Sequence, residues 1–234
     1  MTVEPGGGAL LRLRGVSRSY GERQALHPLD LDVHRGNCTA LFGHNGSGKS
    51  TLLRIAAGRD TPTGGEALFA GRPISEDDPA VRASVAVVGD MAACYPDLTV
   101  REHLELVAVA HAVADPDDWI DHVLADRRLT DHADALPLSL SSGQLQSLLL
   151  AAALVRPRDL LVLDEPEQRL DPDARRRLAE LLLAEKADGV AVLLATHQAE
   201  LAEAVADRMV ALEEGRVIAD GTPAEVLAQL GRRA

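Results

Sequence analysis

Residues 43–51 read GHNGSGKST and fit the pattern Gly-x4-Gly-Lys-Ser/Thr, in which a glycine-rich turn connects a strand to a helix. The apolar run CTALFG leads into this segment, and KSTLLRIAAG has the character of the helix that must follow. Backbone N–H groups of such a turn converge on phosphate oxygens, and the start of the helix adds positive potential. An ordinary glycine-rich turn that opens a helix is the alternative. The pattern favours a loop that binds a nucleoside triphosphate in an α/β fold.

Lys49 stands out in this segment because it is one of two lysines in a chain with 24 basic residues. Its ammonium is a compact charge on a flexible stem and can reach between the β- and γ-phosphates, whereas a wide, planar guanidinium would not fit the same turn. The hydroxyl of Ser50 is a hard oxygen ligand that suits Mg²⁺. The residues expected around the phosphates are Gly43, His44, Asn45, Gly46, Ser47, Gly48, Lys49, Ser50 and Thr51.

Length and composition limit the kind of molecule. The 234 residues, 46% of them hydrophobic, suit one domain or one domain with a lobe. The formal net charge of −12 argues against nucleic-acid binding through a basic surface. Cys38 and Cys94 lack the spacing of a disulfide framework or a zinc site, which suits a reducing cytosol. The longest apolar run, at 148–155, is too short to span a membrane, and the N-terminus lacks the features of a signal peptide.

Hydrophobic periodicity predicts strands and helices in alternation. Two half-exposed strands are expected around a turn, and short strand signals return farther on; these segments are 10–21, 26–36 and 62–74. Further strands are expected at 38–43, 82–90, 160–166, 190–197 and 208–221, and helices at 49–58, 172–189, 198–206 and 222–234. Because strands and helices alternate, the sheet is expected to be mostly parallel with helices on its faces.

The pattern changes between residues 98 and 137, where strand signals give way to helical ones. Helices are expected at 99–114, 116–129 and 130–140, separated by Pro and Asp residues. We interpret this stretch as a helical lobe at about 90–145, inserted into a core formed by residues 1–89 and 146–234.

Two adjacent acids follow an apolar strand in the run LLVLDEP. Asp164 and Glu165 lie at the carboxyl end of this strand, which is the edge where parallel sheets bind ligands. Asp164 is expected to hold Mg²⁺, directly or through water. Glu165 points elsewhere because it is the next residue along the strand, and it is a candidate general base for an attacking water. Two acids that open a turn are the alternative interpretation.

The motif LSSGQ at residues 140–144, taken alone, favours a helix-capping Ser-Ser-Gly turn. Here it follows the phosphate-binding pattern and precedes DEP, LDP and TH. In this order the motifs resemble those of the ATP-binding subunits of ABC transporters, and the resemblance runs from Tyr20 to the last strand. It implies a P-loop NTPase of ABC type, an α/β protein with a mostly parallel core sheet, an antiparallel β subdomain and an inserted helical lobe.

The resemblance also implies that ATP and Mg²⁺ are bound between two subunits arranged head to tail. The signature residues would close over the γ-phosphate of ATP held by a second copy, and the loop containing Leu170 would contact that copy. The residues implied to act in trans are Ser141, Ser142, Gly143, Gln144 and Asp171.

Two further roles rest on the same resemblance. Tyr20 matches the aromatic residue that stacks on adenine, and its polar neighbours favour an exposed ring. A loop tyrosine without a ligand is the alternative. His197, which follows LLAT, matches the histidine that contacts the γ-phosphate and positions the attacking water. Lys49, Glu165 and His197 are therefore the expected catalytic residues.

The chain departs from the family pattern in two places. The family has a glutamine at the end of the strand before the helical lobe, which reaches Mg²⁺ and the attacking water. Here Asp90 takes that place, and no glutamine occurs between Gln24 and Gln144. A carboxylate can ligate Mg²⁺, but its reach is shorter and its charge differs. After the signature, Leu145 and Ser147 stand where basic residues are usual.

The leading hypothesis is an ATPase that powers transport through a separate transmembrane subunit, with this chain peripheral on the cytoplasmic face of the membrane and working as a homo- or heterodimer. Its compact form favours export. One alternative is a catalytically weakened subunit of a heteromeric ABC complex, which Asp90 and the altered signature helix would favour. The other alternative is a non-transport ABC ATPase that acts on DNA or ribosomes. Such proteins usually have coiled-coil inserts or basic linkers, which this acidic chain lacks.

Overall fold

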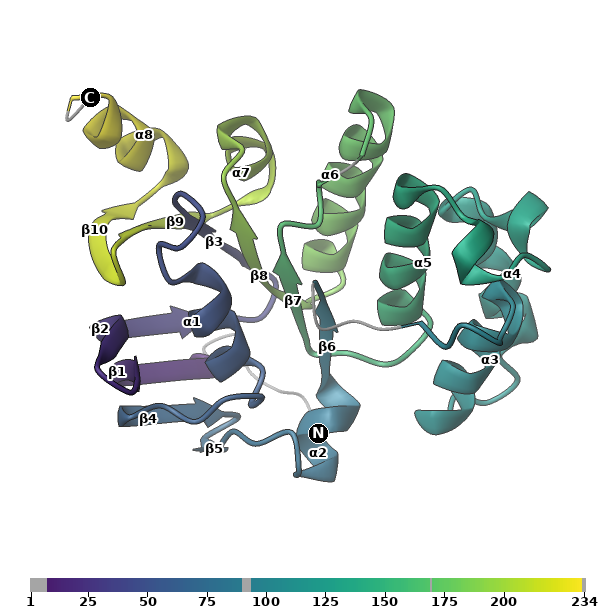
Figure 1. Ribbon diagram of the computed structural model, residues 1–234, viewed down its shortest axis with the longest axis horizontal. Coiled ribbons are helices and arrows are strands. Elements are labelled where there is room, and N and C mark those ends of the chain that lie inside the picture. Colours follow the sequence, from purple (N-terminus) through teal and green to yellow (C-terminus); the bar gives the residue numbers. More distant parts are fainter. Residues whose placement is uncertain (1–7, 90–93, 169, 233–234) are drawn as a thin grey trace.

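The computed structural model describes residues 8–89, 94–168 and 170–232 (Figure 1). The strands are β1 (Leu11–Tyr20), β2 (Arg23–Val33), β3 (Cys38–Phe42), β4 (Gly64–Phe69), β5 (Arg72–Pro73), β6 (Val85–Val88), β7 (Leu160–Asp164), β8 (Ala191–Thr196), β9 (Arg208–Glu213) and β10 (Arg216–Gly221). The helices are α1 (Lys49–Ala56), α2 (Pro79–Ser84), α3 (Val100–Ala110), α4 (Asp117–Asp126), α5 (Ser142–Leu154), α6 (Pro172–Ala187), α7 (Ala199–Val205) and α8 (Pro223–Gly231).

The core sheet has the strand order β10-β9-β3-β8-β7-β6, and all its pairs are parallel except β9 with β10. Successive residues of a strand face opposite sides of a sheet. Leu160 and Val162 therefore pack with α1 in one apolar cluster, whereas Leu161 and Leu163 pack with α6 and α7 in another. Burial on both sides explains why β7 and β8 are almost entirely apolar.

A second sheet, with the order β2-β1-β4-β5, is antiparallel throughout. Its inward residues, such as Leu11 and Leu31, join the cluster that contains Leu52 of α1. Helix α1 thus lies between the two sheets (Figure 1). The expected α/β fold with a mostly parallel core and an antiparallel subdomain is confirmed.

The helices α3, α4 and α5 share an apolar cluster away from both sheets, which includes Leu104, Ile120 and Leu148. Helix α5 also contributes Leu150 and Ala153 to the cluster under the core sheet. This helix therefore belongs to the lobe and the core at once, and the predicted boundary at residue 145 falls inside it. The division of the chain at 90–145 stays a prediction.

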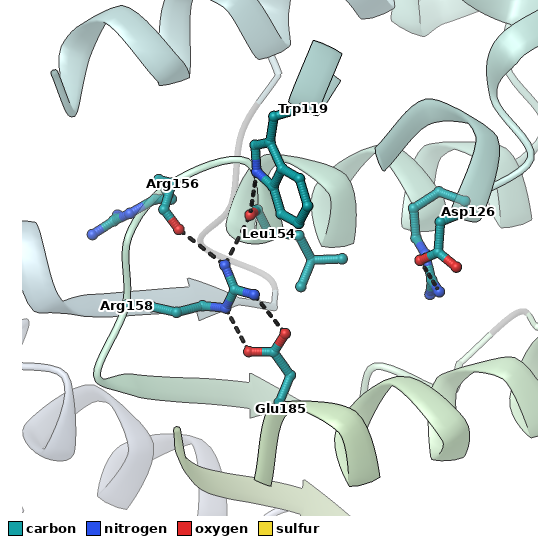
Figure 2. Close-up of polar contacts among 7 residues, drawn as sticks. Trp119, Asp126, Leu154, Arg156, Arg158 and Glu185 are labelled. Atoms are coloured by element: carbon teal, nitrogen blue, oxygen red, sulfur yellow. Dashed lines mark hydrogen bonds and ion pairs between the residues drawn. The ribbon is translucent and has the colours of Figure 1, made fainter. Parts of the chain in front are cut away.

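The backbone carbonyl of Leu154 adds a polar junction between the lobe and the core (Figure 2). The carbonyl of Leu154, at the end of α5, accepts hydrogen bonds from Trp119 Nε1 of α4 at 3.3 Å and from Arg158 Nη1 at 2.8 Å. Arg158 also donates to the carboxylate of Glu185 on α6, with Nε at 2.6 Å, and Glu185 is 4% exposed. A bidentate buried pair therefore fixes where α5 ends relative to α6.

Three expected elements were wrong in detail. Residues 130–140 form two 3₁₀ turns, Thr130–His132 and Pro137–Ser139, because Pro137 disfavours helical backbone at Leu136, which is extended. The stretch 82–90 begins inside α2, which Asp78 caps, and its strand starts at Val85. The stretch 208–221 is a hairpin and not one strand.

The hairpin turns at Glu214 and Gly215, which have φ angles of 47° and 73°. Positive φ at both central residues is the two-residue turn that matches the twist of antiparallel strands. Glycine satisfies this requirement at the second position, but a glutamate at the first gives no sequence signal. In the part of the chain that the structure describes, no helix combines the length and apolar character that crossing a membrane requires.

Candidate active site

The phosphate loop (residues 43–51) joins β3 to α1, and close backbone approach explains its first and last glycines. A Cβ atom on Gly43 would lie 2.3 Å from the carbonyl oxygen of Leu212 in β9. A Cβ atom on Gly48 would lie 2.7 Å from Leu26 Cδ2, and Gly48 has a φ of 108°. Glycine is therefore required at both positions by packing and by backbone conformation, since Gly43 also has a positive φ, of 154°.

Lys49 begins α1 and is 3% exposed. Its Nζ donates hydrogen bonds to the carbonyls of Gly43 at 2.7 Å and His44 at 3.1 Å, and lies 3.3 Å from Glu165 Oε1. The loop thus folds its own backbone around the ammonium, which holds the charge at the mouth of the loop next to the acid at the end of β7.

A cleft of about 670 Å³ opens beside the phosphate loop. Predicted residues that line it are Asn45, Gly46, Gly48, Lys49, Ser50, Thr51, Ser142, Asp164 and Glu165. It is also lined by residues without a motif, which the sequence did not single out: Arg23, Gln24, Ala25, Gly89, Gln146, Leu149, Gln168 and Glu214. Leu145, noted in the sequence as a departure from the family pattern, completes the wall. Gly43, His44 and Ser47 shape the loop but do not line the cleft.

Glu165 directly follows β7 and has a φ of 47°, which is uncommon for a residue with a side chain. Its N–H donates to the carbonyl of Ala195 in β8 at 2.9 Å. This left-handed residue starts a tight turn at residues 165–168, here called the acidic turn, in which the N–H of Gln168 donates to the Glu165 carbonyl at 3.1 Å. Backbone geometry and not strand alternation aims the carboxylate.

Three side chains contact the carboxylate of Glu165. Lys49 lies at Oε1, His197 Nδ1 lies 3.3 Å from Oε2, and Gln168 Nε2 donates to Oε2. Burial raises the pKa of Glu165, but the amide of Gln168 and the charge of Lys49 outweigh it and hold the pKa below its ordinary value. The carboxylate is therefore ionised at neutral pH and able to accept a proton.

Asp164 ends β7 and lines the cleft with Ser50. A Cβ atom on Gly89, which follows β6, would lie 2.8 Å from Asp164 Cβ. The absence of a side chain at Gly89 therefore gives Asp164 the space it occupies. Asp90 is outside the described residues.

Glu167 was not singled out in the sequence, yet it is 0% exposed. The hydroxyl of Thr196, at the end of β8, donates to its Oε1 and accepts from the N–H of Gln198 at 3.0 Å. Burial raises the pKa of Glu167 above its ordinary value, and the nearby Glu165 carboxylate acts in the same direction. The acidic turn is thus tied to the strand end from which His197 follows.

The signature segment caps helix α5. Ser141 accepts a hydrogen bond from Gln144 N at 3.3 Å, and Gln144 Oε1 accepts from Ser141 N at 2.8 Å, a reciprocal capping box. Gln144 Nε2 also lies 2.7 Å from His132 Nε2. Gly143 is in the first turn of α5. Within one chain, these residues therefore hold a helix start, and Ser142 faces the chain's own cleft.

Two other predicted residues have local partners. Asp171 caps α6 by accepting from Ala174 N at 2.7 Å. Tyr20 ends β1 and is 42% exposed; its hydroxyl donates to Asp60, and the guanidinium of Arg18 lies 4.5 Å from its ring centre. Tyr20 is not among the residues that line the cleft, and a cation already covers part of its ring. Its role in stacking on adenine stays a prediction.

A glycine-rich loop opening a helix, with acids and a histidine at neighbouring strand ends, defines a P-loop protein that binds a nucleoside triphosphate. A family model described as ABC transporter matches residues 26–168, and this chain belongs to that family. It is an ATP-binding subunit and an ATPase, as predicted from its motifs.

Known proteins are similar to this chain in sequence and in structure over most of its length. The Nod factor export ATP-binding protein I of Cupriavidus pinatubonensis is 38% identical over 226 residues, which cover 95% of this chain and 70% of that protein. A solved ATP-binding subunit of an ABC transporter has a TM-score of 0.86 at 33% identity, covering 96% of this chain and 95% of that one. A dimeric ATP-binding cassette in a post-hydrolysis state, bound to ADP and Pi, has a TM-score of 0.82 at 26% identity, covering 91% of this chain and 98% of that one. These relatives imply nucleotide binding, a dimer and a membrane partner.

Proposed function

We propose that this chain hydrolyses ATP, with Mg²⁺, to power export through a separate transmembrane subunit. The observation that carries the proposal is that Lys49 and His197 both contact Glu165, and that Glu165 and Lys49 line the cleft beside the phosphate loop. A buried cation next to an ionised carboxylate and an imidazole is an arrangement suited to phosphoryl transfer to water.

The donor set fits Mg²⁺. Ser50 and Asp164 line the same cleft and offer a hydroxyl and a carboxylate, the hard oxygen ligands that Mg²⁺ takes together with phosphates and water. No group of three His, Cys, Asp or Glu side chains suited to a metal occurs among the described residues, so the nucleotide would have to complete the coordination. When bound, the ion would neutralise charge on the phosphates. Asp90 is a further proposed ligand.

Each residue would have a distinct part in hydrolysis. The phosphate loop would bind the β- and γ-phosphates through backbone N–H groups, and Lys49 would turn from Glu165 to the phosphate oxygens. Glu165 would accept a proton from the water that attacks the γ-phosphorus, as the bond to the ADP oxygen breaks. His197 would hold that water or the γ-phosphate.

The signature would complete the site from a second copy. Ser141, Ser142, Gly143 and Gln144 start a helix whose N-terminus carries positive potential, and that potential favours the charged γ-phosphate of a partner's ATP. Asp171 would lie at the contact between the two copies. Hydrolysis would then require a head-to-tail dimer whose opening and closing moves the membrane subunit.

Export is proposed because the relative from Cupriavidus pinatubonensis has a name that states export. The helical lobe would present the groove for the membrane subunit, which would place the chain on the cytoplasmic face of the membrane. Asp90 and Leu145, which depart from the family pattern, favour a second candidate: a weakened subunit that works beside a more active one.

Substituting Glu165 tests the proposed hydrolysis. We expect Glu165→Gln to lower steady-state ATP hydrolysis by at least about 100-fold, because the general base is removed. ATP binding should persist, and ATP-trapped dimers should appear in size-exclusion chromatography. Glu203→Gln, on the exposed side of α7, is the matched control and should leave both measurements unchanged. Full hydrolysis by Glu165→Gln, or none by the unaltered chain with its membrane partner, would contradict the proposal.

A further inference from the structure

Gln168 contributes the one side-chain amide among the three side chains described at the Glu165 carboxylate. Its Nε2 donates to Oε2, the same oxygen that His197 Nδ1 approaches at 3.3 Å. The other oxygen, Oε1, faces Lys49 at 3.3 Å. The two oxygens of the base therefore lie in different surroundings, one in contact with an amide and an imidazole and the other beside the phosphate loop.

The three contacts would respond differently to ATP. Lys49 and His197 are both expected to turn to phosphate oxygens. The described hydrogen bonds of Gln168, in contrast, all lead to Glu165, through its amide nitrogen and its backbone N–H. Gln168 is therefore the group that can stay on the carboxylate while the other two engage the nucleotide.

The acidic turn holds Gln168 where its side chain reaches back to the base. Glu165 N is bonded to Ala195 at 2.9 Å, and Glu167 is buried against Thr196. Both contacts fix the turn to the end of β8, so the position of the amide is set by the fold and not by a free loop. Gln168 also lines the cleft.

We propose that Gln168 is a positioning residue for hydrolysis, which holds Glu165 Oε2 and thereby directs Oε1 to the attacking water. This inference rests on the proposed function, because it assigns the base to Glu165. Water would bond to the γ-phosphorus and transfer its proton to Oε1, the bond to the leaving ADP oxygen would break, and Oε2 would remain bonded to the amide throughout.

The experiment replaces the amide without removing volume. Gln168→Met is similar in size but has no donor, and Gln168→Glu keeps the reach but places a negative charge against the base. For purified chain saturated with Mg²⁺ and ATP, single-turnover ADP formation is measured together with steady-state kcat, KM and ATP affinity. We expect kcat of Gln168→Met to fall about 10- to 100-fold, because a hydrogen bond to a charged group is lost. The kcat of Gln168→Glu should fall further, because its carboxylate repels the base.

KM and ATP affinity should stay within about twofold, since the proposed role of the amide is to hold Glu165 and not to bind the nucleotide. Gln229→Met, which removes an amide donor bonded to Ile218 on the far side of the core, is the matched control and should retain full turnover. Unchanged kcat in Gln168→Met, or equal losses in kcat and ATP affinity, would overturn the positioning role alone. ADP formation by the unaltered chain with its membrane partner that is no faster than by Glu165→Gln would instead overturn the proposed function and this inference together.

Discussion

The phosphate loop and the acidic turn meet in one cleft but are held in opposite ways. In the phosphate loop, glycines allow the backbone to pass close to Leu212 and Leu26, and the backbone itself surrounds Lys49. In the acidic turn, side-chain contacts add to the backbone bond between Glu165 and Ala195, with Glu167 buried against Thr196. The phosphate loop, which is held by backbone contacts, should therefore tolerate exchange of most of its side chains. The acidic turn should be sensitive to exchange of the side chains that make its contacts.

The largest effect should come from adding one methyl group to the phosphate loop. Gly43→Ala places a Cβ atom 2.3 Å from the Leu212 carbonyl oxygen, so β9 or the loop must move. We expect ATP binding to be lost and the free energy of unfolding to fall by about 3 kcal/mol or more. Isothermal titration with ATP and chemical denaturation measure the two effects.

The control for that variant is Gly71→Ala, in the turn between β4 and β5. Gly71 has a φ of 79°, but a Cβ atom there would meet nothing within 4 Å. We expect only the cost of the backbone conformation, about 1 kcal/mol, with ATP binding retained. Equal losses in the two variants would show that conformation and not close approach makes glycine necessary at residue 43.

The same contrast explains what the sequence could and could not predict. The phosphate loop was predictable because its glycines and Lys49 meet requirements that lie within nine consecutive residues. The order of strands and helices was predictable for the same local reason. The hairpin at Glu214 and the helical start of the stretch 82–90 were missed, since their signals are one uncommon φ angle and one capping aspartate.

The acidic turn was only half predictable. Asp164 and Glu165 stand out at the end of an apolar strand, but Gln168 and Glu167 belong to no pattern. Their contacts depend on the left-handed backbone at Glu165 and on β8, which is distant in sequence. The partnership of the signature with a second chain remains a prediction, because the structure contains one chain. The role of Asp90 also remains a prediction, because Asp90 is outside the described residues.

A smaller effect should come from the buried acid of the turn. The pKa of Glu167 is raised in the folded state, so the unfolded chain releases this proton at lower pH. Its contribution to stability is therefore full below the ordinary pKa and is lost as pH rises toward the raised value. Each unit of difference between the pKa values in the folded and unfolded states changes the free energy of unfolding by about 1.4 kcal/mol. We expect Glu167→Gln to be more stable than the unaltered chain by about 1 kcal/mol or more at pH 8.

The sign of that prediction can be checked by denaturation at several pH values. At pH 4 the two proteins should have nearly equal free energies of unfolding, because the carboxyl is protonated in both states of the unaltered chain. A variant less stable than the unaltered chain at pH 8 would show that Glu167 is ionised and paired with a cation in the folded protein. The turn would then be held by charge and not by a neutral hydrogen bond.

The smallest effect is the coupling between Glu167 and Thr196. A double-mutant cycle of Glu167→Met, which removes the acceptor, with Thr196→Val should give a coupling energy of about 0.5–1 kcal/mol, since the hydroxyl donates to the carboxyl. The same cycle with Thr222→Val, which removes the cap of α8 at the edge of the core, should be additive. Coupling at Thr196 should also appear in hydrolysis, because this contact fixes the turn that carries Gln168. Additivity at Thr196 in both stability and kcat would mean that backbone bonds alone hold the acidic turn, as they hold the phosphate loop.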